Sequence, residues 1–73
     1  MAKQTKDIVE YTIALINEFA DTYGLSENES FRYIDQHNGI ELINQCYGIM
    51  HTLSFSDSVA GMASYCRRQG GTL

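Results

Sequence analysis

The stretch that decides the fold is Asp7 to Tyr23, DIVEYTIALINEFADTY. Its apolar side chains recur every three to four positions, the spacing of one face of an α-helix. On a helical projection they cover an arc of about 160°, wider than a coiled-coil seam. The face consists of Ile8, Val9, Thr12, Leu15, Ile16, Phe19, Ala20 and Tyr23, with Ile13 at its edge. A face this wide contacts several neighbours, so we expect this helix to be the central element of the domain.

A second helix is expected directly after the first. Gly24 follows the helical pattern and suits the left-handed conformation that ends many helices. Ser26 and Glu29 have the spacing of a capping box, in which each side chain accepts a hydrogen bond from the other residue's backbone amide. The pair Asn38-Gly39 is suited to closing this second helix.

Two more helices are expected in the remainder of the chain. The third covers residues 40–53, and its apolar face consists of Leu42, Ile43, Cys46, Ile49, Met50 and Leu53. Ser54, with Asp57 three residues later, predicts the N-cap of the fourth helix. The apolar face of that helix consists of Phe55, Val59, Met62, Ala63 and Cys66. Arg67 and Arg68 fall in its last turn, where positive charge is favoured, and a glycine pair follows.

Length and pattern together predict one small domain. The chain has 73 residues, and it shows no alternating strand pattern and no internal repeat. We therefore predict an all-α fold, a compact bundle of four short helices. The predicted boundaries are a flexible N-terminus at residues 1–6, a helical domain at 7–69 and a C-terminal tail at 70–73. A domain this small has a thin stability margin, which a partner often supplements.

The charge pattern disfavours nucleic-acid binding. The formal net charge is -4, and residues 34–65 contain no lysine or arginine to neutralise phosphates. An alternative function is nevertheless open, because the turn at residues 38–39 permits a helix-turn-helix regulator. The recognition helix of that alternative would present Glu41, Asn44 and Gln45 without a basic residue, which argues against it.

Composition indicates where the protein works. The longest apolar run is far shorter than the roughly 20 residues of a membrane span. Residues 1–6 are polar and precede no apolar segment of the kind found in signal peptides. Two cysteines are too few for a secreted disulfide scaffold. We therefore expect a cytoplasmic protein with reduced thiols and no membrane association.

Histidine and cysteine give no catalytic or zinc site by their spacing. On one helix, Cys46 and His51 point about 140° apart, so a nucleophile and base cannot meet there. A zinc site with His37 would need closer convergent spacing than the sequence has. We therefore predict no enzyme, no cofactor, and no catalytic, cofactor-binding or metal-binding residue.

The sulfur-containing side chains leave two alternatives beside simple packing. The i, i+4 pairs Cys46/Met50 and Met62/Cys66 are soft ligands that would suit Cu(I). Both apolar faces already need these four side chains for the core, which is the interpretation we prefer. A Cys46–Cys66 disulfide depends on a Cα separation that the sequence does not give.

Tyrosine is the remaining signal for function. Tyr23 belongs to the apolar face of the first helix, whereas Tyr11, Tyr33, Tyr47 and Tyr65 lie at the edges of apolar faces or off them. Tyrosine is enriched at protein interfaces, although tyrosines of this kind also cover the core rim of small domains. We predict a protein-interaction module with a protein partner or self-association, and these four tyrosines as its possible interface.

Several short segments resemble a known family in their order and spacing. They are Glu10-Tyr11-Thr12, Ile13-Ala14-Leu15-Ile16, Tyr23-Gly24-Leu25-Ser26, Gly39-Ile40, Tyr47…His51-Thr52, Ser54-Phe55 and Tyr65-Cys66-Arg67-Arg68…Gly70-Gly71. From about Asp7 to Gly71 the chain is similar to short bacterial proteins grouped as domain of unknown function 3791. This resemblance implies no established activity, cofactor or site residue. Family members are often encoded beside an ADP-ribosyltransferase-like protein, which implies a partner or neutraliser of a toxin-like enzyme.

Overall fold

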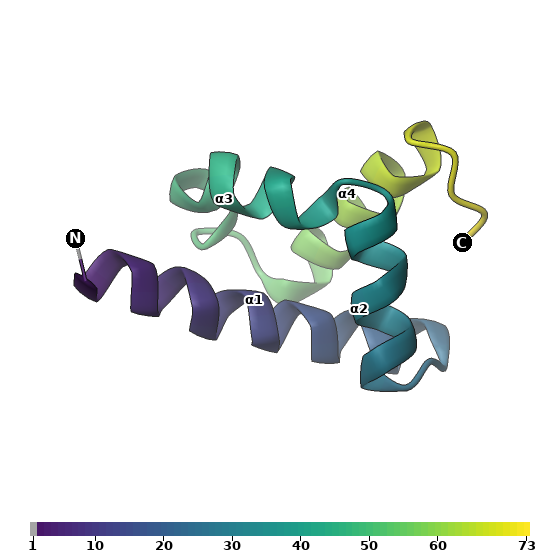
Figure 1. Ribbon diagram of the computed structural model, residues 1–73, viewed down its shortest axis with the longest axis horizontal. Coiled ribbons are helices and arrows are strands. Elements are labelled where there is room, and N and C mark those ends of the chain that lie inside the picture. The colour runs from purple at the N-terminus through teal and green to yellow at the C-terminus, as the bar shows by residue number, and fades with distance from the viewer. Residues whose placement is uncertain (1) are drawn as a thin grey trace.

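The regular structure of the chain is entirely helical in the residues that the computed structural model describes, 2–73, with side chains described from residue 6 onward. Four helices follow one another: α1 (Ala2–Tyr23), α2 (Glu27–Gln36), α3 (Gly39–Met50) and α4 (Phe55–Arg68). In Figure 1, α1 runs along one side of the molecule, α2 crosses its end, and α3 runs back above α1. The Cα radius of gyration is 11.4 Å. The predicted compact four-helix bundle is confirmed.

The first helix is longer than the sequence pattern predicts. It begins at Ala2 rather than Asp7, because residues 2–6 include good helix formers although the apolar pattern starts only at Ile8. Residues 2–6 of the N-terminus predicted to be flexible are therefore helical, and residue 1 lies outside the described residues. The predicted central position of α1 is confirmed, since it packs against α2, α3 and α4.

The predicted caps and turns between the helices are confirmed. The Ser26 hydroxyl accepts from the Glu29 amide at 3.1 Å, and the Ser26 amide donates to Glu29 Oε1 at 2.8 Å. The hydrogen bond from the Ser26 amide, and after it the hydrogen bond with the Ser26 hydroxyl, holds the pKa of the Glu29 carboxyl below its usual value. Gly24 and Asn38 have positive φ angles of 67° and 64°, as their predicted turn positions require. Ser54 caps α4 by accepting from the Asp57 amide at 3.1 Å.

The third helix is shorter than predicted, and part of its apolar face is exposed. It ends at Met50, after which the amides of Thr52 and Leu53 donate to carbonyls three residues back, both at 3.1 Å. This tighter turn takes Leu53 off the helical face. The expectation that all six apolar residues of this face are buried is wrong, since Ile49 is 70% and Leu53 45% exposed.

Exposed apolar side chains also occur on the other helices. The expectation that Val9 belongs to the buried face of α1 is wrong, since it is 52% exposed, and Ile13 is 54% exposed. Phe55, at the start of α4, is likewise exposed. Ile13 lies at the margin of its apolar arc, whereas Val9 and Phe55 lie in the N-terminal part of their helices; four short helices leave such positions uncovered.

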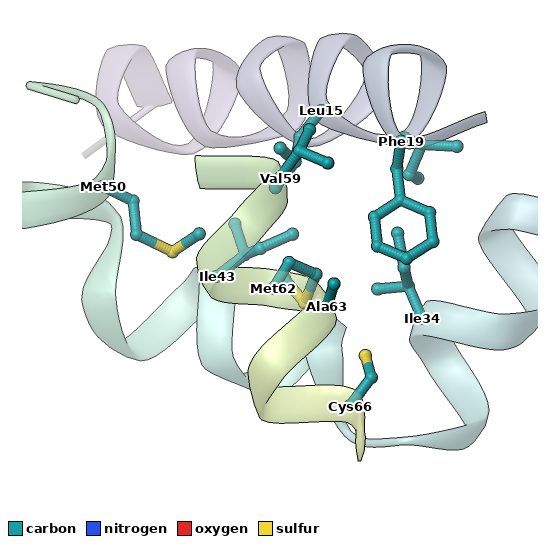
Figure 2. Packing of buried hydrophobic residues seen from close by; sticks show 10 residues of the cluster. Leu15, Phe19, Ile34, Ile43, Met50, Val59, Met62, Ala63 and Cys66 are labelled. Atoms are coloured by element: carbon teal, nitrogen blue, oxygen red, sulfur yellow. The ribbon is translucent and has the colours of Figure 1, made fainter. Parts of the chain in front are cut away.

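The core lies between α1 and the other three helices. Its buried members are Leu15, Ile16, Phe19, Ile34, Ile43, Met50, Val59, Met62, Ala63 and Cys66. Figure 2 shows the ring of Phe19 directed from α1 toward Ile34 of α2, while Leu15 meets Val59 of α4. Two serines, Ser30 and Ser58, are also buried, and neither was predicted from the sequence.

At two glycines the backbone packs closely against side chains of other elements. At Gly39 a β-carbon would lie 2.5 Å from Ile34 Cγ2 and 2.8 Å from Met62 Sδ, so the start of α3 can pack there only without a side chain. At Gly71 a β-carbon would overlap the Tyr33 hydroxyl. The predicted tail at residues 70–73 therefore lies against the domain, where the Leu73 amide donates to Tyr33 Oη at 3.0 Å.

Replacing Phe19 with alanine tests the position of this core. Phe19 is fully buried, so Phe19→Ala should lower the free energy of unfolding by about 3–5 kcal/mol. Urea denaturation followed by far-ultraviolet circular dichroism measures this change. Glu18→Ala, one position away and exposed, is the control and should change stability by about 0.5 kcal/mol or less. An unchanged midpoint for Phe19→Ala would show that the core has been misplaced.

Candidate functional site: a groove between α3 and α4

Two of the four tyrosines predicted as an interface lie together. The rings of Tyr11 and Tyr47 meet edge to face at 5.6 Å between centroids, and Tyr11 stacks on Phe55 at 5.6 Å. His51 stacks on the other end of this cluster, 4.7 Å from the Tyr47 ring. The aromatic cluster thus joins α1 to α3, to the turn after α3 and to the start of α4.

The Tyr11 hydroxyl is committed to the fold. It lies 2.8 Å from Ser58 Oγ and 3.2 Å from the Met50 carbonyl oxygen, and Ser58 Oγ lies 3.3 Å from that same carbonyl. A buried hydroxyl needs such partners to offset its lost hydration. The three groups fix the end of α3 and the first turn of α4 against α1. No sequence signal distinguished Ser58 from the exposed serines beside it.

The other two tyrosines lie apart from this cluster. Tyr33 stacks on Phe19 at 5.8 Å and lies tilted against the His37 ring at 4.4 Å, and its hydroxyl accepts a hydrogen bond from the amide of Leu73. Tyr65 lies on α4, half-buried, beside α3. The structure therefore brings Tyr11 and Tyr47 together and places Tyr33 and Tyr65 elsewhere. Their predicted role as an interface stays a prediction.

Tyr65 belongs to a largely apolar groove between α3 and α4, with a volume of about 220 Å³. Leu42, Cys46 and Met50 of α3 line one wall, and Leu53 follows in the turn. Ile49 lies one helical turn from Cys46 and Leu53 and extends the apolar surface at the rim. The groove thus combines a lipophilic lining with exposed apolar side chains, and the sequence did not predict it.

The α4 wall of the groove carries the charges. Asp57 lies near one end and Arg68 near the other, with Gly61 between them. A β-carbon at Gly61 would meet no atom within 4 Å, so the wall is open there. The Arg68 guanidinium donates to Ser64 Oγ on the same helix at 2.9 Å. The groove therefore offers hydrophobic contact along its length and one charge of each sign at its ends.

The residues considered for chemistry are dispersed. His37 and His51 directly follow α2 and α3, and Nδ1 of each lies within hydrogen-bond distance, 2.6 and 2.8 Å, of the carbonyl four residues earlier. Cys46 and Cys66 are both free thiols. Of the proposed soft ligands, Cys46, Met50 and Met62 line the groove. Among the described side chains, no three His, Cys, Asp or Glu residues gather closely enough to hold a metal ion.

The two thiols lie in different surroundings. Cys46 is half-buried in the groove wall, whereas Cys66 is fully buried in the core. Burial raises the pKa of the Cys66 thiol because the thiolate would lose its hydration. Cys66 is therefore a packing residue, and Cys46 is the thiol that reports on access to the groove.

Thiol reactivity tests this arrangement. An aromatic disulfide reagent should modify Cys46 about tenfold faster than Cys66 in the folded protein, because Cys66 requires local opening. Cys46→Ser should remove the fast phase, and Cys66→Ala should keep it. The raised pKa of Cys66 also makes the free energy of unfolding depend on pH. The stabilising contribution of the protonated Cys66 thiol is complete below the ordinary pKa of a thiol and is lost as the pH rises through the folded-state pKa. Equal rates for both thiols would contradict the assigned burial.

Across residues 2–73, no helix combines the length and apolar character needed to cross a membrane.

These features define a small four-helix module whose candidate site is a surface groove with an apolar lining. The chain belongs to the family described as "Protein of unknown function (DUF3791)", whose model matches residues 10–69, more than half of its length. No curated protein and no solved structure is significantly similar to it. The resemblance seen in the sequence is thereby confirmed at the level of the family.

Proposed function

We propose that this protein is a non-enzymatic interaction module that binds a protein through the groove between α3 and α4. The observation that carries the proposal is the apolar lining of the groove, which includes the 45% exposed Leu53, with the 70% exposed Ile49 one helical turn from Cys46. Contiguous exposed apolar surface on a small domain is typical of a site where a protein binds.

The character of the groove supports a protein rather than a small polar ligand. Its walls carry leucine, methionine and cysteine side chains, and its polar groups lie mainly on α4. Methionine side chains adapt their shape to the surface that packs on them, which suits a protein partner. The charges at the groove ends would set the register of a bound helix more than its affinity.

The side chains of α3 argue against the helix-turn-helix alternative. The exposed side chains on the outer side of α3 are Glu41, Asn44 and Gln45. A recognition helix normally includes arginine or lysine for phosphates and guanines. A salt-dependent gel shift with this protein would contradict that choice.

The effect of Ile49→Glu on protein binding tests the proposal. The tagged full chain is expressed in its native host, and the proteins that co-purify, including untagged copies of the chain, are quantified. A carboxylate at this rim position should reduce the bound protein about tenfold or more, because it would be desolvated against an apolar partner. The ADP-ribosyltransferase-like neighbour implied by the family resemblance is the first heterologous candidate.

Ile13→Glu is the matched control. It makes the same chemical change at an isoleucine that is 54% exposed on α1, away from the groove. The control should retain the bound protein at the wild-type level, and circular dichroism should give both variants the wild-type helix content. Equal retention by Ile49→Glu and the wild type would contradict the proposal.

A further inference from the structure

Four residues of α4 form one line along the open wall of the groove. They are Asp57, Gly61, Ser64 and Arg68, at the spacing i, i+4, i+7 and i+11 that keeps side chains on one helical face. Ser64 is half-buried, and the other three are exposed. The line therefore has an acid at its start, two small residues in its middle and a base at its end.

The two charges of this line cannot satisfy each other within the chain. Eleven residues of helix separate Asp57 from Arg68 by about 16 Å, well beyond the reach of an ion pair. A second α4 helix laid antiparallel against the first brings Asp57 of each copy opposite Arg68 of the other. The same register sets Gly61 opposite Ser64, where small residues allow the helix backbones to approach closely.

The α3 wall adds an apolar line beside this charged one. Leu42, Cys46 and Ile49 lie on one helical face, and Leu53 lines the groove from the turn that follows α3. A partner on the groove face would cover this apolar line together with the charged line of α4.

We infer that the groove face binds a second copy of this chain in an antiparallel two-fold arrangement, with Asp57 of each copy paired to Arg68 of the other. The inference rests on the proposed function and names its partner. The supporting observation is charge complementarity. In an antiparallel pair of α4 helices, Asp57 of each copy lies opposite Arg68 of the other, so the same ion pair can form twice. Such a self-complementary patch is what an isologous dimer interface requires.

Charge reversal with rescue tests the pairing. Asp57→Arg should place like charges together at both ends and raise the dimer dissociation constant about tenfold, and Arg68→Asp should do the same. The double variant Asp57→Arg/Arg68→Asp restores opposite charges and should return the constant to within about threefold of the wild type. Sedimentation equilibrium gives the constants, and thermal melting verifies folding. Each single variant also weakens the interaction of its charge with the helix dipole. The double variant retains both of these effects, so recovery of its dissociation constant would be due to the restored charge pairs.

Substitution of the central glycine gives a second, independent readout. Gly61→Gln should improve helix propensity in the monomer while its side chain separates the two α4 helices, so stability rises and the dimer is lost. Gly48→Gln is the matched control, because Gly48 is also an exposed helical glycine with open space around it and lies outside the groove. It should gain stability and leave the dimer intact.

The outcomes separate this inference from the proposed function. A wild-type chain that is monomeric up to about 1 mM, or charge reversals without rescue, overturns the second-copy inference. If Ile49→Glu then still loses a foreign partner, the proposed function stands with that other occupant. If no protein, foreign or identical, depends on Ile49, both proposals fail.

Discussion

Burial of one wide face of α1 is the constraint on which the rest of the structure depends. Leu15 and Phe19 are fully buried, and α1 packs against each of the other three helices. A 73-residue chain has too little interior for two cores, so every short helix must reach this one face. The close approach at Gly39 follows from the same constraint, since α2, α3 and α4 converge there over Ile34 and Met62.

Buried hydroxyl groups give this arrangement its geometry. Ser30 Oγ of α2 donates to the Ile16 carbonyl of α1 at 2.8 Å, and Ser58 of α4 joins the Tyr11 hydroxyl. Apolar packing is tolerant of direction, whereas a buried hydroxyl is costly unless its partner is in place. Two small polar residues therefore fix how α2 and α4 lie on α1.

The groove is a consequence of how α3 divides its apolar residues. Ile43 and Met50 are buried in the core, Met50 also lines the groove with the half-buried Leu42 and Cys46, and Ile49 is exposed. α1 and α4 both pack against α3, and Leu42 and Cys46 line the groove on its α4 side. Gly61 leaves α4 without a side chain in the middle, and an open apolar surface results.

The sequence by itself determined the four helices, their caps and the membership of most of the core. These features are local: the capping box of Ser26 and Glu29 or the periodicity around Phe19 depends on residues within a few positions. Only the tertiary structure decided that Ile49 is exposed, that Ser58 is buried and that Tyr11 meets Tyr47 while Tyr33 lies apart. Periodicity defines an apolar arc but not which part of it a neighbour covers, because that depends on how the helices pack against one another.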